Sequence, residues 1–323
     1  MIDFLNDALD CKVENIIEGE NDCFNWIRRG VGIIECIPKV KYDKSIMLSA
    51  GIHGNETAPI EILNMICQDL FNNKIELRQR ILLILGNPFA MKSGVRYLKN
   101  DMNRMFCGKY HHLSQDQETY RAAELEKIVV DFFENSIIKT KRYHYDLHTA
   151  IRTSLFPTFA LLPFQLQAYD EYMLESLNAS ELDAIVYHSE NGATFTHFSS
   201  SCCQASSVTL ELGKAKPFGQ NNLQDFYPIH QVLLNLIANQ PLPVRQKSAV
   251  QNFKVVGSIL KLNDDFKLNL TDAAPNFTEF APKEIIYSQG GHNIWYDYST
   301  HLLFPNLKVK KGLRAGLVLI KKT

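Results

Sequence analysis

Apolar and polar positions alternate in two rhythms over the first two thirds of the chain. Continuous apolar runs predict buried strands at residues 45–50, 81–85, 143–147, 159–162, 184–187 and 208–212. Apolar positions at helical spacing predict helices from residue 57 to about 70, at about 115–134, at 165–177 and at 223–238. Strands that alternate with helices favour an α/β domain, with a largely parallel or mixed central sheet flanked by helices.

The pattern changes at residues 239–243, where the sequence Asn-Gln-Pro-Leu-Pro is typical of a linker. The stretches that follow are short and alternating, at residues 253–262, 266–270, 284–287, 293–296 and 313–320, and Gly, Asn, Asp and Pro separate them. Such a pattern predicts strands and requires no long helix. We therefore expect a large α/β domain at residues 1–243, which is the candidate catalytic domain, and a smaller all-β domain at residues 244–323.

The composition is that of a globular protein. The chain has 323 residues, of which 46% are hydrophobic and 21% charged, so a large core can form. The formal net charge of −1 favours neither nucleic acid nor an anionic membrane as a partner. Positive charge that holds an anionic substrate would have to be local.

Compartment signals favour the cytoplasm. The segment from Met1 to Asp7 lacks the basic and apolar regions of a signal peptide, and runs such as residues 81–85 are too short to span a bilayer. The seven cysteines are odd in number and have no C-x-x-C spacing, which predicts reduced thiols. Any metal would then be held by histidine and carboxylate.

The segment Gly-Ile-His-Gly-Asn-Glu at residues 51–56 follows a predicted strand and opens a predicted helix. His53 and Glu56 are three residues apart on this turn, so both could bind one ion, and a catalytic zinc site uses three protein ligands. His148, at the end of another strand, is the candidate third ligand. His144 is its rival, because period two places it on the same strand face. A structural histidine and a helix-terminal carboxylate are the alternatives.

Residues 94–104 form a second group of candidates. Arg96, Asn103 and Arg104 follow a strand and its Asn-Pro turn. Two guanidinium groups and an amide suit the binding of carboxylates and the polarisation of a carbonyl. A solvated, salt-bridged loop is the alternative interpretation.

The order of these motifs resembles a known superfamily. The sequence contains H-G-N-E at 53–56, D-x-N-R at 101–104, D-L-H at 146–148 and a strand that carries Glu211, which is the order found in zinc carboxypeptidase-like enzymes. Residues 51–59, 146–152 and 209–213 are similar to the succinylglutamate desuccinylase and aspartoacylase branch. The resemblance covers residues from about 45 to 225 and implies a zinc carboxypeptidase-like α/β fold.

The resemblance also implies a set of roles. It implies one Zn²⁺ per chain, bound by His53, Glu56 and His148. The other implied roles are Glu211 as general base, Arg96 on the scissile carbonyl, Asn103 and Arg104 on a substrate carboxylate, Asp101 as hydrogen-bond partner of a ligating imidazole, and Arg152 on a further carboxylate. An aromatic residue of the C-terminal domain is also implied, and Tyr287, Trp295 and Tyr296 are equal candidates.

The implied activity is hydrolysis of N-succinylglutamate to succinate and glutamate, in arginine catabolism. The local arginines suit a small anionic N-acyl amino acid with three carboxylates. The alternatives are an acylase for acetylaspartate or another N-acyl amino acid, a carboxypeptidase, and a non-catalytic zinc-binding protein. The compact C-terminal domain disfavours the carboxypeptidase, and the presence of both Glu211 and Arg96 disfavours the binding protein. The sequence leaves the oligomeric state open, a homo-oligomer included.

Overall fold

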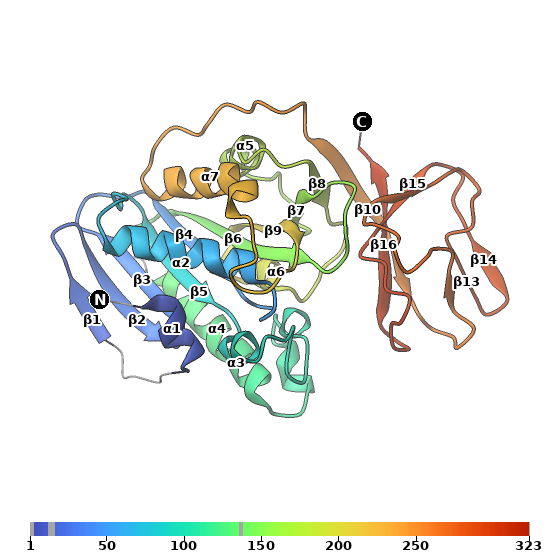
Figure 1. Ribbon diagram of the computed structural model, residues 1–323, viewed down its shortest axis with the longest axis horizontal. Helices are drawn as coiled ribbons and strands as arrows, with labels where there is room; N and C mark the ends of the chain where they lie inside the picture. The colour runs from blue at the N-terminus through green and yellow to red at the C-terminus, as the bar shows by residue number, and fades with distance from the viewer. Residues whose placement is uncertain (1–2, 12–16, 136–137, 323) are drawn as a thin grey trace.

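The structure is a computed structural model that describes residues 3–11, 17–135 and 138–322. Met1 and Ile2, the first residues of the N-terminal segment that was compared with a signal peptide, lie outside these ranges. Within the described residues, a large mixed sheet runs through the molecule in the strand order β1-β2-β3-β5-β4-β6-β9-β7-β8-β10-β16-β15-β12. Figure 1 shows β1 and β2 at one end of the molecule and the C-terminal strands at the other.

Strands β1 to β9 form the part of the large sheet that carries the candidate site. They are β1 (Ile17–Glu20), β2 (Phe24–Gly30), β3 (Ile33–Pro38), β4 (Lys44–Ala50), β5 (Arg80–Leu85), β6 (Lys141–Ala150), β7 (Thr158–Leu162), β8 (Ala184–Tyr187) and β9 (Ser206–Lys214). The pairs β4–β5, β4–β6 and β6–β9 are parallel, whereas β3–β5 and β7–β9 are antiparallel. The carboxyl ends of β4, β6 and β9 therefore meet at one edge of the sheet.

Helices cover both faces of this sheet. One core cluster joins the sheet to α1 (Phe4–Leu9), α2 (Thr57–Phe71), α5 (Glu171–Ala179) and α7 (Tyr227–Ile237). A second cluster joins the opposite face to α4 (Gln117–Glu134), α6 (Phe195–Cys203) and the short 3-10 helix η1 (Met102–Arg104). The remaining short helices are α3 (Pro88–Ser93), η2 (Lys109–His112) and η3 (Leu223–Phe226). The predicted α/β fold is confirmed.

The C-terminal strands continue the large sheet. β10 (Gln251–Leu260) pairs in parallel with β8, and β16 (Arg314–Lys321), β15 (Thr300–Leu303) and β12 (Thr278–Phe280) follow in antiparallel order. A small separate sheet contains β11 (Lys267–Leu268), β13 (Tyr287–Gln289) and β14 (His292–Ile294). The predicted C-terminal β domain is thus present and forms the separate lobe in Figure 1. The boundary at residue 243 stays a prediction, and residues 240–250 form neither helix nor strand.

Two predicted elements are wrong in position. The helix predicted at 165–177 begins only at Glu171, because the Asp170 side chain accepts a hydrogen bond from the backbone of Met173 and caps the helix there. The strand predicted at 284–287 begins only at Tyr287, because residues 281–284 form a turn in which Lys283 has a positive φ of 65°. Local hydrogen bonds decided both boundaries.

Two further observations bear on the compartment. Among the described residues, no helix combines the length and the hydropathy that a membrane span needs. All seven cysteines lie in the described ranges, and each is a free thiol.

Candidate metal centre

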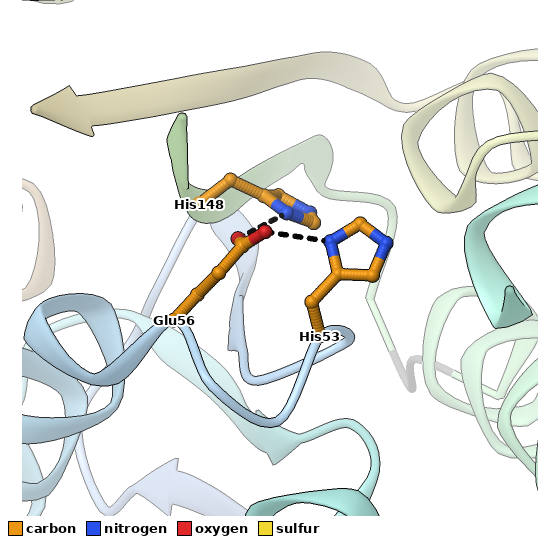
Figure 2. Close-up of side chains that lie close together, drawn as sticks. All are labelled: His53, Glu56 and His148. Atoms are coloured by element: carbon orange, nitrogen blue, oxygen red, sulfur yellow. Dashed lines mark hydrogen bonds and ion pairs between the residues drawn. The ribbon is translucent and has the colours of Figure 1, made fainter. Parts of the chain in front are cut away.

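His53, Glu56 and His148 converge on one point, as Figure 2 shows. His53 and Glu56 lie in the turn between β4 and α2, and His148 lies near the end of β6. The pairing of Ala50 with Leu147 aligns these two parallel strands, so that residues a few positions beyond each come together. The three side chains are only 2–3% exposed.

The donor atoms of these side chains point inward. Nδ1 of His53 lies 2.9 Å from Oε1 of Glu56, and Nδ1 of His148 lies 2.9 Å from Oε2 of the same carboxylate. Within the described residues, one donor atom from each side chain can be chosen so that all lie within 4.8 Å of one another. Such a separation suits donors around a single ion.

Carboxylates hold the far side of both imidazole rings. Nε2 of His53 lies 3.0 Å from Asp101, and Nε2 of His148 lies 2.9 Å from Asp146. A carboxylate on one ring nitrogen fixes the tautomer that leaves the other nitrogen free to bind a metal. The resemblance implied such a partner role for Asp101, and the structure shows its contact with His53, while the role itself stays a prediction. Asp146 was missed, although its spacing from His148, two residues along a strand, places both on one face.

These contacts shift the pKa values of the group strongly. Burial raises the pKa of Glu56, but the two imidazoles outweigh burial and hold that pKa well below its usual range. Burial lowers the pKa of His148, but Asp146 and Glu56 outweigh it and raise that pKa well above its usual value. Burial raises the pKa of Asp101, but His53 and, to a smaller degree, Arg104 and Arg96 outweigh burial and lower that pKa.

The residues fit a zinc ion. Two imidazoles and one carboxylate are a ligand set of catalytic zinc sites, in which a fourth position stays open. With the Nε2 proton of His53 directed at Asp101, the buried Nδ1 carries the free lone pair and makes no hydrogen bond, and a metal ion would satisfy it.

His144, the rival ligand, lies elsewhere. Its ring is buried between the Ser49 hydroxyl, 2.8 Å from Nε2, and the Ser199 hydroxyl, 2.6 Å from Nδ1. Both ring nitrogens are thus occupied inside the core. Burial lowers the pKa of His144 to about 4, only partly opposed by Asp146.

Glu211 lies beside the three converging side chains and has no hydrogen-bond partner in the part of the chain that the structure describes. The register of β6 and β9 places it opposite His148. The side chain is buried, makes no hydrogen bond with any described residue, and leaves Oε2 unsatisfied. Burial and the Glu56 charge raise the pKa of Glu211 to about 7, whereas His148 and Arg96 lower it. A carboxyl group in this state can both take and give a proton near neutral pH.

Arg96 also reaches the centre. Its Nη1 donates to Oε1 of Glu56 at 2.7 Å, and its Nη2 lies 3.9 Å from Asp101. Asn103 is buried, and its Oδ1 accepts from the backbone N–H of Phe195, so the amide nitrogen is left as the donor for a ligand. Arg104 is exposed and donates only to the carbonyl of Asn103 among the described residues.

Arg152 contacts the backbone of the C-terminal part of the chain. Its guanidinium donates to the backbone carbonyls of Asp272 and Ala274 in the C-terminal part of the chain. Both bonds use Nη1, and Nε and Nη2 make no hydrogen bond with a described residue, so the role on a further substrate carboxylate stays a prediction.

Arg314, the first residue of β16, is a cation that the sequence analysis missed. Among the described residues it makes no hydrogen bond and no ion pair. Burial and Arg104 lower the pKa of Arg314 to about 10, while Asp101 opposes them. Because Arg104 and Asp101 both affect this pKa, the first residue of β16 lies within electrostatic reach of the candidate centre. No local sequence pattern singles out Arg314, because only the tertiary structure brings it near Asp101 and Arg104.

The C-terminal aromatic candidates pack within their own part of the chain. Tyr287 and Tyr296 contact the apolar cluster of the C-terminal strands, and Trp295 is 45% exposed. No described contact brings any of the three to the ligands, so the choice among them stays open.

Comparison with known proteins places the chain in a family. Residues 42–237 match the succinylglutamate desuccinylase/aspartoacylase catalytic domain, and residues 248–322 match the AstE/AspA barrel-sandwich hybrid domain. The chain belongs to the succinylglutamate desuccinylase/aspartoacylase family. The two matched ranges leave residues 238–247 between them, next to the predicted linker.

Individual members of the family are similar over almost the whole chain. A succinylglutamate desuccinylase of Yersinia pestis (strain Pestoides F) is 46% identical over 322 residues, 99% of this chain and 97% of that protein. The crystal structure of the succinylglutamate desuccinylase from Chromobacterium violaceum has a TM-score of 0.88 at 35% identity, over 99% of this chain and 98% of that one. That of the enzyme from Vibrio cholerae has a TM-score of 0.91 at 28% identity, over 98% and 94%.

Gly54→Ala is expected to weaken metal binding. A Cβ at Gly54 would lie 2.2 Å from the backbone of Ala90 and Met91 in α3, so the turn that carries His53 and Glu56 would have to move. We expect the zinc affinity to fall about 10-fold or more, because a displacement of the order of 1 Å spoils ligand geometry. Competition with a chelating dye measures it. In Gly192→Ala, the matched control, the new Cβ meets nothing closer than 3.9 Å, and the affinity should not change.

His144 is expected to make the protein acid-sensitive. Its pKa is about 4 in the folded protein and 6.5 in the unfolded chain, so below pH 6.5 the unfolded chain binds a proton that the folded chain does not. The free energy of unfolding should therefore fall as the pH is lowered, until pH 4. Between pH 7 and pH 5 this group accounts for about 2 kcal/mol. Urea unfolding at both pH values should show a correspondingly smaller fall for His144→Gln, and an equal fall in both proteins would contradict the assignment.

Proposed function

We propose that this chain is a zinc-dependent amidohydrolase that splits N-succinyl-L-glutamate into succinate and L-glutamate. The observation that carries the proposal is the buried carboxyl of Glu211, which makes no hydrogen bond with a described residue and lies next to the converging His53, Glu56 and His148. The full-length similarity to a succinylglutamate desuccinylase supports the acyl group and the amino acid. The resemblance further supports a cytoplasmic location and a role in arginine catabolism, and both stay predictions.

A zinc ion bound by the three ligands would supply a Lewis acid, which makes water a better nucleophile near neutral pH and polarises the amide carbonyl. The chain's own residues prepare this centre. Asp101 and Asp146 hold the two imidazoles by Nε2, so that the Nδ1 atoms stay directed at the common point.

Glu211 moves the proton. Its raised pKa of about 7 makes it a base that takes a proton from the attacking water and an acid that returns it to the leaving amine nitrogen. Its lack of a hydrogen-bond partner within the described residues supports this double role, because no other group competes for the proton. One carboxylate thus serves both halves of the reaction.

Arg96 stabilises the charge that develops on the carbonyl oxygen. Its guanidinium lies at the ligand set, where it already donates to Glu56 at 2.7 Å. A donor held in place before the reaction begins loses little in reorganisation, and loss of one oxyanion donor typically costs about 10²–10³ in rate.

Three further groups supply positive charge or donors for the substrate carboxylates. We propose the free amide nitrogen of Asn103, the guanidinium of Arg104 and the guanidinium of Arg314 for this task. His188 supports a cationic surrounding, because burial, Arg314, His197 and Arg104 lower its pKa to about 4. Arg152, which donates from Nη1 to two backbone carbonyls, remains a proposal for a further carboxylate.

The function is tested by succinate release from N-succinylglutamate, with acetylaspartate and a C-terminal dipeptide measured in parallel. We expect a strong preference for succinylglutamate, loss of activity with a chelator, and recovery with zinc at one ion per chain. Preference for acetylaspartate would assign another acylase, and preference for the dipeptide a carboxypeptidase. A bound zinc ion with no turnover of any of the three would overturn the substrate assignment.

Glu211→Gln separates catalysis from metal binding. The substitution keeps the size of the side chain and removes the proton acceptor, so kcat should fall about 10²–10⁴-fold. Zinc content should stay at the wild-type level, because Glu211 contacts no ligand by a hydrogen bond. Kinetics and metal analysis of the same preparation measure both, and unchanged turnover would exclude Glu211 as the proton carrier.

A further inference from the structure

Glu118 is a buried carboxylate that the proposed reaction does not use. It is the second residue of α4 and is 1% exposed. It makes no ion pair with any described residue. A buried carboxylate is costly unless hydrogen bonds satisfy it, so its partners indicate what it does.

Four N–H donors meet this carboxylate. They are the backbone N–H groups of Leu98, Lys99 and Asn100, at 2.8, 2.8 and 2.7 Å, and the side-chain amide of Asn87, at 2.9 Å. Two of these donate to Oε1 and two to Oε2. An ionised carboxylate offers acceptor positions for four donors and carries no donor of its own, which matches this arrangement.

The segment held in this way carries the functional side chains. Arg96 lies two residues before the bound amides, and Asp101 follows them directly. Asp116, the N-cap residue of α4, adds a further anchor by accepting a hydrogen bond from the side chain of Asn100 at 2.7 Å. The N-terminal end of α4 thus fixes the middle of a loop that otherwise has no helix or strand.

The same segment is connected to the metal-binding turn. The backbone N–H of Gly54 donates to the carbonyl of Arg96 at 3.1 Å, and Asp101 holds His53. Asn87, which donates to Glu118, also caps α3, the helix against which Gly54 packs. Glu118 therefore lies where the arginine loop, α3 and α4 meet.

We propose that Glu118 is a positioning residue that holds the loop of Arg96 and Asp101 in place against the metal-binding turn, so that Arg96 acts on the scissile carbonyl. The proposal rests on the proposed function, because Arg96 is assigned its task there. Glu118 makes no hydrogen bond with His53, Glu56 or His148, and it acts through the backbone amides of residues 98–100 and the side chain of Asn87 that it binds.

Glu118→Gln tests the proposal, because in either orientation the amide group of glutamine faces two of the four donors with a donor. We expect kcat/KM for succinylglutamate to fall about 10–100-fold in the zinc-loaded protein, mainly in kcat. Glu134→Gln, an exposed position on the same helix, is the matched control and should keep the wild-type kinetics.

A double-mutant cycle with Arg96→Lys distinguishes positioning from general stability. If Glu118 acts through Arg96, its substitution should cost much less in the Arg96→Lys background than in the wild type. Equal fold-changes in both backgrounds, or a lower Tm with unchanged kcat/KM, would overturn the proposal. If Glu118→Gln does not fold, Glu118→Asp, which keeps the charge and shortens the side chain, takes its place in the cycle.

Hydrogen exchange of the wild-type protein tests the anchor independently of activity. The amides of residues 98–100 should exchange slowly although they lie in a loop, and fast exchange would overturn the proposal. A protein that hydrolyses none of the three substrates yet protects these amides would contradict the proposed function and leave the anchor in place. The two failures are therefore distinguishable.

Discussion

The parallel register of β4, β6 and β9 is the constraint on which the candidate site depends. It brings His53 and Glu56, beyond the end of one strand, next to His148 on the second and Glu211 on the third. Each side chain leaves the sheet at the same edge, where the strands end and the backbone can turn. A shift of one residue in either pairing would turn a side chain to the other face.

The Glu56 carboxylate is the shared partner of the charged groups at that edge. Its carboxylate faces both imidazoles and Arg96 and also accepts the backbone N–H of Thr149 at 3.0 Å. Glu211 lies in the field of the same carboxylate but has no partner among the described residues, so its pKa moves upward while that of Glu56 moves downward. Two buried carboxyl groups with opposite pKa shifts fit the proposed roles, in which Glu56 binds the metal as a carboxylate and Glu211 transfers a proton.

The loop from Gly94 to Arg104 depends on a different kind of support. It contributes Arg96, Asp101 and Asn103 without being part of the sheet, and backbone hydrogen bonds to Glu118 replace the ladder it lacks. Long side chains on an unsupported loop would lose conformational entropy on binding the substrate. Burial of the anchoring carboxylate removes that cost in advance, which links the packing of α4 to the chemistry at the sheet edge.

Apolar periodicity predicted the α/β class and the C-terminal β strands, because it is a local property of the chain. Spacing suggested the His53 and Glu56 pair, and the family resemblance supplied the other candidate site residues. His53 and Glu56 share one turn, and the D-L-H strand end contains His148. The predictions from local patterns did not include β2, β3, α6 or β15. In β2 most residues are only partly buried, and in β3 the buried run is interrupted by the charged Glu35. Spacing left His144 and His148 open because both lie on one strand face, and the family resemblance implied His148. The tertiary structure agrees with that choice, since it places His148 beside His53 and Glu56 and holds His144 between two serine hydroxyls in the core. The tertiary structure was also needed to show Glu118 and Arg314 near the loop and Arg152 on the backbone of Asp272 and Ala274, because those contacts join residues far apart in the chain.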